Sequence, residues 1–141
     1  MEIHVLSRKE MGAQLLQETI PENAAIISIS TPDVSYIPLP FHKCKNAVLL
    51  ELQFDDVDSD ENGLQPMSWE QAENVAEFVL KNKPREIWVH CDAGQSRSAG
   101  VAAAIAKYLF GDDTLFFQGG YTPNMKCYSQ ILCALCTSDL V

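Results

Sequence analysis

The sequence is poor in basic residues: ten lysines and arginines stand against nineteen aspartates and glutamates, so the formal net charge is −9 over 141 residues. Proteins that bind the nucleic-acid backbone need a basic face to neutralise its phosphates. This balance argues against a nucleic-acid partner, although it still allows a local basic pocket for a single phosphate group.

Long hydrophobic runs are also missing. No stretch approaches the ~20 apolar residues of a membrane-spanning helix, and the first ten residues, MEIHVLSRKE, have neither an apolar run nor a small-residue cleavage site. The five cysteines are an odd number at uneven spacing. We therefore expect a cytoplasmic protein with reduced thiols and no membrane partner.

No segment rich in glycine, serine or proline divides the chain, and nothing in it repeats. Apolar residues make up 47% and charged residues 21% of the composition, which is ordinary for a globular protein. Because domains usually run to ~100–200 residues, we predict one domain over residues 1–141.

Short apolar runs alternate with helical periodicities along the chain. The predicted strands are Ile3–Ser7, Ala24–Ser30, Ala47–Phe54 and Glu86–His90. Four helices are predicted. The first is Arg8–Thr19, the third is Arg97–Phe110, and the last begins near Pro123. The second opens at Ser68, which forms a capping box with Gln71, and ends at Lys83-Pro84. Such alternation predicts an α/β fold in which a central, mostly parallel sheet is flanked by helices.

Three of the predicted helices have an apolar face that we expect to be buried. These faces comprise Met11, Leu15 and Leu16; Trp69, Ala72, Val75, Ala76 and Val79; and Met125, Tyr128, Leu132 and Leu135. The segment Asp55–Met67 is expected to be a long polar loop.

One segment, Trp88–Gly100 (WVHCDAGQSRSAG), has the pattern of a binding or catalytic site. A predicted strand runs into His90-Cys91, five residues follow, and a predicted helix begins at Arg97. A helix N-terminus presents unpaired N–H groups and a partial positive charge, and a short loop above it directs further N–H groups to the same centre. This arrangement predicts a cradle for phosphate between the strand and the helix N-terminus. Gly94 allows the turn, and Arg97 offers a planar fork for two phosphoryl oxygens.

Cys91 stands at the base of this predicted cradle. Oriented N–H groups, a helix N-terminus and a guanidinium all favour a thiolate over a thiol, so the cradle would both create a nucleophile and bind the group that it attacks. A single cysteine at a strand end is more often a small buried apolar residue. The pattern His-Cys-x-x-Gly-x-x-Arg-Ser in a strand-to-helix context favours the catalytic interpretation.

The segment resembles the phosphate-binding signature of the cysteine-dependent protein tyrosine phosphatases. Over about residues 24–136 the chain is similar to their dual-specificity branch: Leu52–Asp56 looks like the strand and aspartate of the general acid, and Thr122-Pro123-Asn124 looks like the start of the closing helix. By this resemblance, Cys91 is the nucleophile, Arg97 the phosphate clamp, Ser98 a hydroxyl that helps the thiolate leave, and His90 a residue that orients the loop. The phosphate loop then comprises Asp92, Ala93, Gly94, Gln95, Ser96 and Arg97, and neither a cofactor nor a metal is expected.

Cleavage of a phosphomonoester also requires a proton for the leaving oxygen. The acidic candidates crowd into one loop and are Asp55, Asp56, Asp58, Asp60 and Glu61. Asp56 fits the family pattern best, because it is the first residue fully clear of the strand. Asp55 and Asp58 remain open as alternatives.

Two metal sites are competing interpretations. Asp56-x-Asp58-x-Asp60 begins like a calcium loop, but Glu61 stands where that loop needs glycine and Met67 where it needs glutamate. Cys133 and Cys136 have the spacing of a zinc pair, but with no second pair nearby we expect them to pack in the core.

The resemblance implies a phosphorylated protein or peptide substrate that is hydrolysed through a cysteinyl-phosphate intermediate. An RNA 5′-phosphatase of the same fold shares these motifs, and a catalytically inactive phospho-binding module is the alternative from another class. The phosphate loop holds no basic residue besides Arg97, which argues against inositol polyphosphates. Tyr36 and Phe41 are candidates for the wall of the pocket.

Overall fold

The computed structural model describes residues 1–60 and 62–138. Glu61, one of the acidic candidates, lies outside the described residues. The strands are β1 (Glu2–Leu6), β2 (Ala25–Ser30), β3 (Val48–Gln53) and β4 (Glu86–His90). The α-helices are α1 (Arg8–Leu16), α2 (Trp69–Asn82), α3 (Arg97–Phe110) and α4 (Met125–Ser138), and the short 3-10 helices are η1 (Phe41–Lys43) and η2 (Thr114–Phe117).

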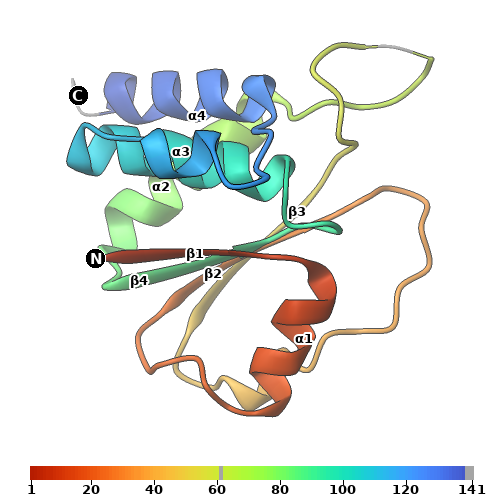
Figure 1. Cartoon of the computed structure of the whole chain (residues 1–141), viewed down its shortest axis with the longest axis vertical. Helices are drawn as coiled ribbons and strands as arrows, with labels where there is room; N and C mark the ends of the chain where they lie inside the picture. The colour runs from red at the N-terminus through yellow and green to blue at the C-terminus, as the bar shows by residue number, and fades with distance from the viewer. Residues whose placement is uncertain (61, 139–141) are drawn as a thin grey trace.

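The four strands form one sheet in the order β1-β4-β2-β3, and every pairing in it is parallel. Helices α2, α3 and α4 cover one face of this sheet, while α1 lies against the other face (Figure 1). The predicted α/β architecture is confirmed. The sheet is parallel throughout, since each strand returns through a crossover rather than through a hairpin.

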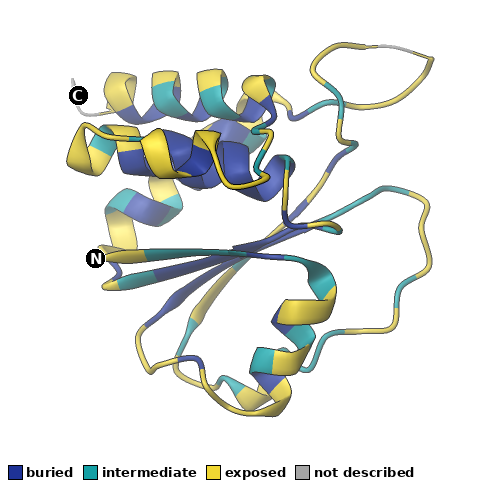
Figure 2. Cartoon of the chain, in the orientation of Figure 1, coloured by how far each residue is buried: buried dark blue, intermediate teal, exposed yellow. Residues whose placement is uncertain are grey.

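The two central strands are buried from both sides, as Figure 2 shows. On β2, Ile27 packs into the larger cluster under the three helices, and its neighbour Ile26 packs into the smaller cluster against α1. Val89 and Trp88 on β4 divide in the same way, because successive side chains of a strand point to opposite faces. Burial on two faces explains why these strands are continuous apolar runs in the sequence.

The helix ends follow local signals. Ser68 and Gln71 form the predicted capping box of α2, and α3 spans the predicted Arg97–Phe110 before Gly111 ends it with φ of +73°. Helix α1, in contrast, stops at Leu16 rather than at the predicted Thr19.

The three predicted apolar faces are buried over most of their length, but each has one exposed residue. Leu16 and Trp69 are 63% and 42% exposed, because each lies at the end of its helix, beyond the layer that the helix covers. Helix α4 buries Cys127, Ile131, Ala134 and Leu135, whereas Met125 is 46% exposed. Tyr128, Leu132 and Leu135 of the predicted face pack in or against the same cluster, and α4 lies close to α3 at Gly100. A Cβ on Gly100 would lie 2.5 Å from the carbonyl oxygen of Asn124.

The parallel order brings the carboxyl ends of the strands to one edge of the sheet (Figure 1). The loops that follow β2, β3 and β4 therefore gather there, as expected for ligand sites in open α/β sheets. Within the described residues, no helix combines the length and hydrophobicity needed to cross a membrane.

Candidate active site

Cys91 follows the last residue of β4 and is 2% exposed. Its N–H donates to the carbonyl oxygen of Leu6 at 3.3 Å, so the sheet register continues into the loop. The Sγ atom lies 3.1 Å from the hydroxyl oxygen of Ser98 and accepts the N–H of Gly94 at 3.3 Å. The loop and the first turn of α3 thus each place one hydrogen-bonding group against the sulfur.

Three carbonyl groups of the phosphate loop, Asp92 to Arg97, are bound outside the loop. Asp92 O accepts the N–H of Arg8 at 3.2 Å, Gln95 O accepts that of Thr122 at 2.9 Å, and Ser96 O accepts those of Asn124 and Gly100 at 2.9 and 2.8 Å. These carbonyls are bound outside the loop, and the N–H of Gly94 points to the sulfur at its centre. The cradle for a tetrahedral oxyanion stays a prediction that this backbone path is compatible with.

Gly94 permits this path. Its φ is +71°, and an added Cβ would lie 2.5 Å from the nitrogen of Ser7 and 2.6 Å from the carbonyl carbon of Leu6. The loop therefore presses directly against the end of β1, and only glycine combines that φ with that contact.

Arg97 is buried, and its guanidinium is oriented by two acceptors. Nη1 donates to the carbonyl oxygen of Phe54 at 2.7 Å, and Nη2 lies 3.2 Å from Oδ2 of Asp92. A guanidinium has five N–H donors, so two bonds hold its plane and leave donors for a bound anion.

Asp92 connects the phosphate loop to the segment after β2. Its carboxylate accepts the hydroxyl groups of Thr31 at 2.8 Å and of Tyr36 at 2.9 Å. Burial alone would raise the pKa of Asp92, but these two hydrogen bonds and the Arg97 guanidinium outweigh it and lower that pKa. Asp92 is thus an anion that aligns Arg97, a role that the sequence did not reveal.

Of the two aromatic candidates for the pocket wall, Tyr36 stands beside the loop through its bond to Asp92. Phe41 lies in η1 and packs against the cluster under α1, so it does not join this wall.

His90 is fully buried directly before Cys91. Burial lowers the pKa of His90 to about 4, so its ring is neutral at pH 7. Nδ1 lies 3.2 Å from the carbonyl oxygen of Cys91, which can only accept, and Nε2 lies 2.7 Å from the hydroxyl of Ser28. The single ring proton therefore belongs on Nδ1, and Ser28 donates to Nε2. Ser28 and His90 are register partners on β2 and β4, so this pair ties the loop backbone to the sheet.

The acidic candidates after β3 occupy different environments. Asp55 closes its own loop: its carboxylate accepts the N–H of Gln65 at 2.8 Å, and its N–H donates to Gln65 O at 2.7 Å. Asp56 lies at the rim of the phosphate loop, where Oδ1 accepts the hydroxyl of Ser96 at 2.8 Å. Asp58 lines the same hollow of about 340 Å³ as Asp56, and no hydrogen bond from the described residues holds it to the phosphate loop.

Asn124 is the positioning residue that sequence reasoning missed. Its Nδ2 donates to Oδ1 of Asp56 at 3.0 Å and to the carbonyl oxygen of Val57 at 3.1 Å. Its Oδ1 accepts the N–H groups of Lys126 and Cys127 at the start of α4. The only signal in the sequence was the motif Thr122-Pro123-Asn124. An asparagine before a helix predicts a helix cap, and this does not reveal a contact with Asp56.

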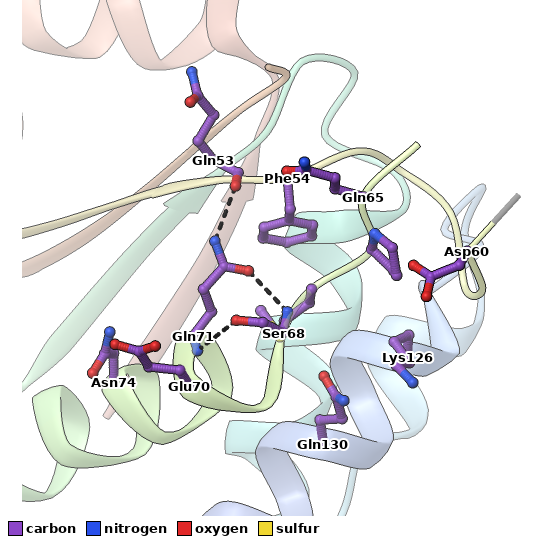
Figure 3. Close-up of a pocket in the computed structure, with 12 residues that line it drawn as sticks. Gln53, Phe54, Asp60, Gln65, Ser68, Glu70, Gln71, Asn74, Lys126 and Gln130 are labelled. Carbon is purple, nitrogen blue, oxygen red and sulfur yellow. Dashed lines mark hydrogen bonds between the residues drawn. The ribbon is translucent and has the colours of Figure 1, made fainter. Parts of the chain in front are cut away.

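The loop that carries Asp56 is also secured at its base (Figure 3). The side chain of Gln71 donates to the carbonyl oxygen of Gln53 at 2.9 Å and completes the capping box with Ser68. These bonds join the end of β3 to the start of α2 beside a hollow of about 670 Å³, which Lys126 and Gln130 border from α4.

The remaining cysteines and possible metal ligands lie elsewhere. Cys133 and Cys136 are exposed on α4, so the expectation that they pack in the core is wrong. Burial raises the pKa of Cys127 far above its ordinary value. Among the described residues, Glu2, His4 and Glu86 have the spacing of metal ligands. They lie at the amino ends of β1 and β4, opposite the phosphate loop, with His4 3.4 and 3.7 Å from the two carboxylates.

No protein-family model matches the chain, and no curated protein matches it. Among solved structures, human DUSP28 aligns with a TM-score of 0.63 at 16% identity over 98% of this chain and 94% of that one. PTPMT1 in complex with PI(5)P aligns with a TM-score of 0.59 at 14% identity over 99% and 95%. The human tyrosine phosphatase-like serine/threonine/tyrosine-interacting protein aligns with a TM-score of 0.55 at 19% identity over 96% and 87%. At these identities the comparison establishes the fold alone, which this chain shares with these solved structures.

Proposed function

We propose that this protein is a metal-independent phosphomonoester hydrolase that acts on phosphotyrosine, or on phosphotyrosine and phosphoserine/threonine, in proteins or peptides. The observation that carries the proposal is the surroundings of Cys91 Sγ. The Gly94 N–H and the Ser98 hydroxyl both reach the sulfur, at the base of a loop that ends in the oriented guanidinium of Arg97. A nucleophile and an oxyanion cradle in one loop suit phosphoryl transfer.

In the first step, the Cys91 thiolate attacks phosphorus, an S–P bond forms, and the P–O bond to the substrate breaks. Arg97 and the inward N–H groups of the loop hold the equatorial oxygens. Asp56, in its carboxylic acid form, gives its proton to the leaving oxygen. Both bonds to Asp56 fall on Oδ1, and no hydrogen bond from the described residues reaches Oδ2, so Oδ2 is the oxygen available to carry that proton.

In the second step, water attacks the cysteinyl-phosphate. Asp56, now a carboxylate, accepts a proton from that water, the S–P bond breaks, and inorganic phosphate leaves. The Ser98 hydroxyl, 3.1 Å from Sγ, donates a hydrogen bond to the departing thiolate. Oδ1 of Asp56 remains anchored to Ser96 and Asn124, so both steps use one position of the acid.

Two alternative functions share this geometry. A phospho-binding module without catalysis is disfavoured because Cys91, Arg97 and Asp56 are all present and grouped around one loop. An RNA 5′-phosphatase is disfavoured by the net charge of −9, because an RNA chain is attracted by a basic face.

Hydrolysis of para-nitrophenyl phosphate tests the proposal. The wild-type protein should turn it over in the presence of EDTA. Cys91→Ser should abolish turnover yet still bind phosphate, because backbone N–H groups make most of the cradle. Arg97→Lys should be nearly as damaging, since a point charge cannot replace a bidentate fork. Cys133→Ser, on the exposed side of α4, is the matched control and should retain full turnover.

Full turnover by Cys91→Ser would refute the mechanism, and faster cleavage of a 5′-triphosphorylated RNA than of a phosphotyrosyl peptide would favour the RNA alternative.

A further inference from the structure

We propose that an apolar groove beside the phosphate loop binds an aliphatic side chain next to the phosphorylated residue of a peptide substrate. The inference rests on the proposed phosphatase function and adds a substrate class to it. The flanking groove, as we call it, has a volume of about 700 Å³ and lies between α1 and the segment after β2. Its apolar surface comes from Leu16, Ile37 and Leu39.

The apolar residues of the flanking groove are left in solvent by the fold. Ile37 is 88% exposed and Leu16 is 63% exposed. Single exposed apolar side chains are ordinary on a protein surface, but here they line one concave site. Covering a leucine-sized side chain from water contributes ~1.5–3 kcal/mol, so a substrate that fills the groove gains binding energy that a small aryl phosphate does not.

The flanking groove and the phosphate cradle share a wall. Asp92 and Tyr36 line the groove, and the same Asp92 carboxylate accepts the Tyr36 hydroxyl and holds Arg97. A chain whose phosphoryl group occupies the cradle therefore places its neighbouring residues over Tyr36 and into the groove. This continuity is what assigns the groove to the substrate.

The groove is also preorganised. The guanidinium of Arg8 lies 4.2 Å from the centre of the Tyr36 ring, and its Nη2 donates to the carbonyl oxygen of Ile37 at 2.9 Å. Pro38 and Pro40 flank Leu39 and restrict the backbone of the same wall. A surface that is already ordered loses little conformational entropy on binding.

Charge identifies the occupant as a peptide with acidic character. Arg8 and Lys9 border the groove and Asp92 is the one acidic residue in its lining, so the lining carries one net positive charge in a chain whose net charge is −9. An aspartate or glutamate near the phosphorylated residue would complement these two side chains. The anionic leaflet of a membrane would instead repel the acidic remainder of the molecule, which disfavours a lipid phosphate as the occupant.

A set of phosphotyrosyl peptides tests the inference. A single leucine is moved through the three positions on either side of phosphotyrosine, in a background of glycine, serine and one glutamate. At one position the leucine should raise kcat/KM about ten-fold over the same background peptide without leucine. Activity is expressed as the ratio to kcat/KM for para-nitrophenyl phosphate, so that changes in the chemical step cancel.

Ile37→Asp and Leu16→Glu should each remove this leucine-dependent gain. Both positions are exposed, so thermal unfolding should confirm that the variants fold. Leu115→Asp, an equally exposed leucine in η2, is the matched control and should keep the gain.

Three outcomes would overturn the inference. One is turnover of para-nitrophenyl phosphate without any positional effect of leucine, which leaves the proposed function standing. Another is an equal loss of the gain in Leu115→Asp. The third is faster hydrolysis of a phosphatidylinositol phosphate in vesicles than of any peptide, with Ile37→Asp lowering the lipid reaction. If the wild-type protein fails even on para-nitrophenyl phosphate, the proposed function falls and the groove inference falls with it.

Discussion

The hydroxyl of Ser96 donates a hydrogen bond of 2.8 Å to Oδ1 of Asp56. Ser96 is the N-cap of α3, yet its side chain makes no capping bond to that helix. The hydroxyl serves the neighbouring loop instead, and the first N–H groups of α3 stay available to an anion. This bond and that from Asn124 set Asp56 apart from Asp55 and Asp58.

Asp56→Asn should therefore lower kcat by roughly 10²–10⁴-fold on a phosphotyrosyl peptide, whose leaving oxygen needs a proton. The loss should be much smaller on an aryl phosphate with a strongly acidic leaving group. The basic limb of the kcat–pH profile should also disappear, since it reports deprotonation of the acid. Steady-state kinetics on the two substrates measure both effects.

Asp55→Asn and Asp58→Asn are the matched controls for this prediction. Neither should show a loss that depends on the leaving group, because Asp55 is engaged with Gln65 and Asp58 is not held at the phosphate loop. A leaving-group-dependent loss in Asp58→Asn alone would place the acid two residues further along the loop.

Alkylation should distinguish Cys91 from the other cysteines. Iodoacetate carries a carboxylate that suits the proposed anion cradle, and the Gly94 N–H and the Ser98 hydroxyl lie within hydrogen-bond distance of the Cys91 sulfur. At pH 6, Cys91 should be modified well before the exposed Cys133 and Cys136, and Cys127 should stay inert because burial raises its pKa. Peptide mass spectrometry follows each site, and phosphate or vanadate should protect Cys91. Equal labelling of Cys91 and Cys133 would show that the loop does not activate its thiol.

The buried imidazole of His90 should make stability depend on pH. In the unfolded chain it titrates near its ordinary value of 6.5, whereas burial lowers the pKa to about 4 in the folded protein. Between these values the unfolded state binds a proton that the folded state does not, so the free energy of unfolding falls as the pH is lowered. The contribution is complete above pH 6.5 and should shrink by ~3 kcal/mol on reaching pH 4.

Urea unfolding of the wild type and of His90→Asn at pH 7 and pH 4 measures this contribution. The variant should be less stable at pH 7 because it loses the contact between the His90 ring and Ser28, but its stability should fall less steeply with acid. Parallel pH dependences for the two proteins would contradict a neutral, buried His90.

Gly94→Ala should disrupt the phosphate loop. The added Cβ would lie 2.5 Å from the nitrogen of Ser7, in a backbone with φ of +71°. We expect a loss of about 3 kcal/mol in unfolding free energy and weaker protection of Cys91 by phosphate. Gly119→Ala is the matched control, because Gly119 has a φ of +67° and no atom within 4 Å of its Cβ position. Gly119→Ala should lower the unfolding free energy by only ~1–2 kcal/mol, because of its left-handed backbone. Equal losses in the two variants would show that the contact with Ser7 does not cause the loss in Gly94→Ala.

Local sequence signals determined the strand and helix that hold the phosphate loop. The bounds of β4 and α3 follow from an apolar run, a Cys-x₅-Arg interval and a terminal glycine, all of which act over a few residues. The expectation that a loop between them turns N–H groups inward followed from the same stretch, and the N–H of Gly94 does point to the Cys91 sulfur. These features need no information from distant parts of the chain.

Contacts between distant residues decided the rest. Asp56 meets Ser96 and Asn124, which lie 40 and 68 positions away, and Tyr36 meets Asp92 across 56 positions. In the sequence, the neighbouring aspartates are nearly equivalent acids, and Tyr36 is one aromatic residue among several. Only the parallel sheet brings the ends of β2, β3 and β4 to one edge, where hydrogen bonds and charge give each of these side chains its own environment. The close approach of α4 to Gly100 likewise depends on how two helices pack, and a helical periodicity by itself does not specify which face meets its neighbour.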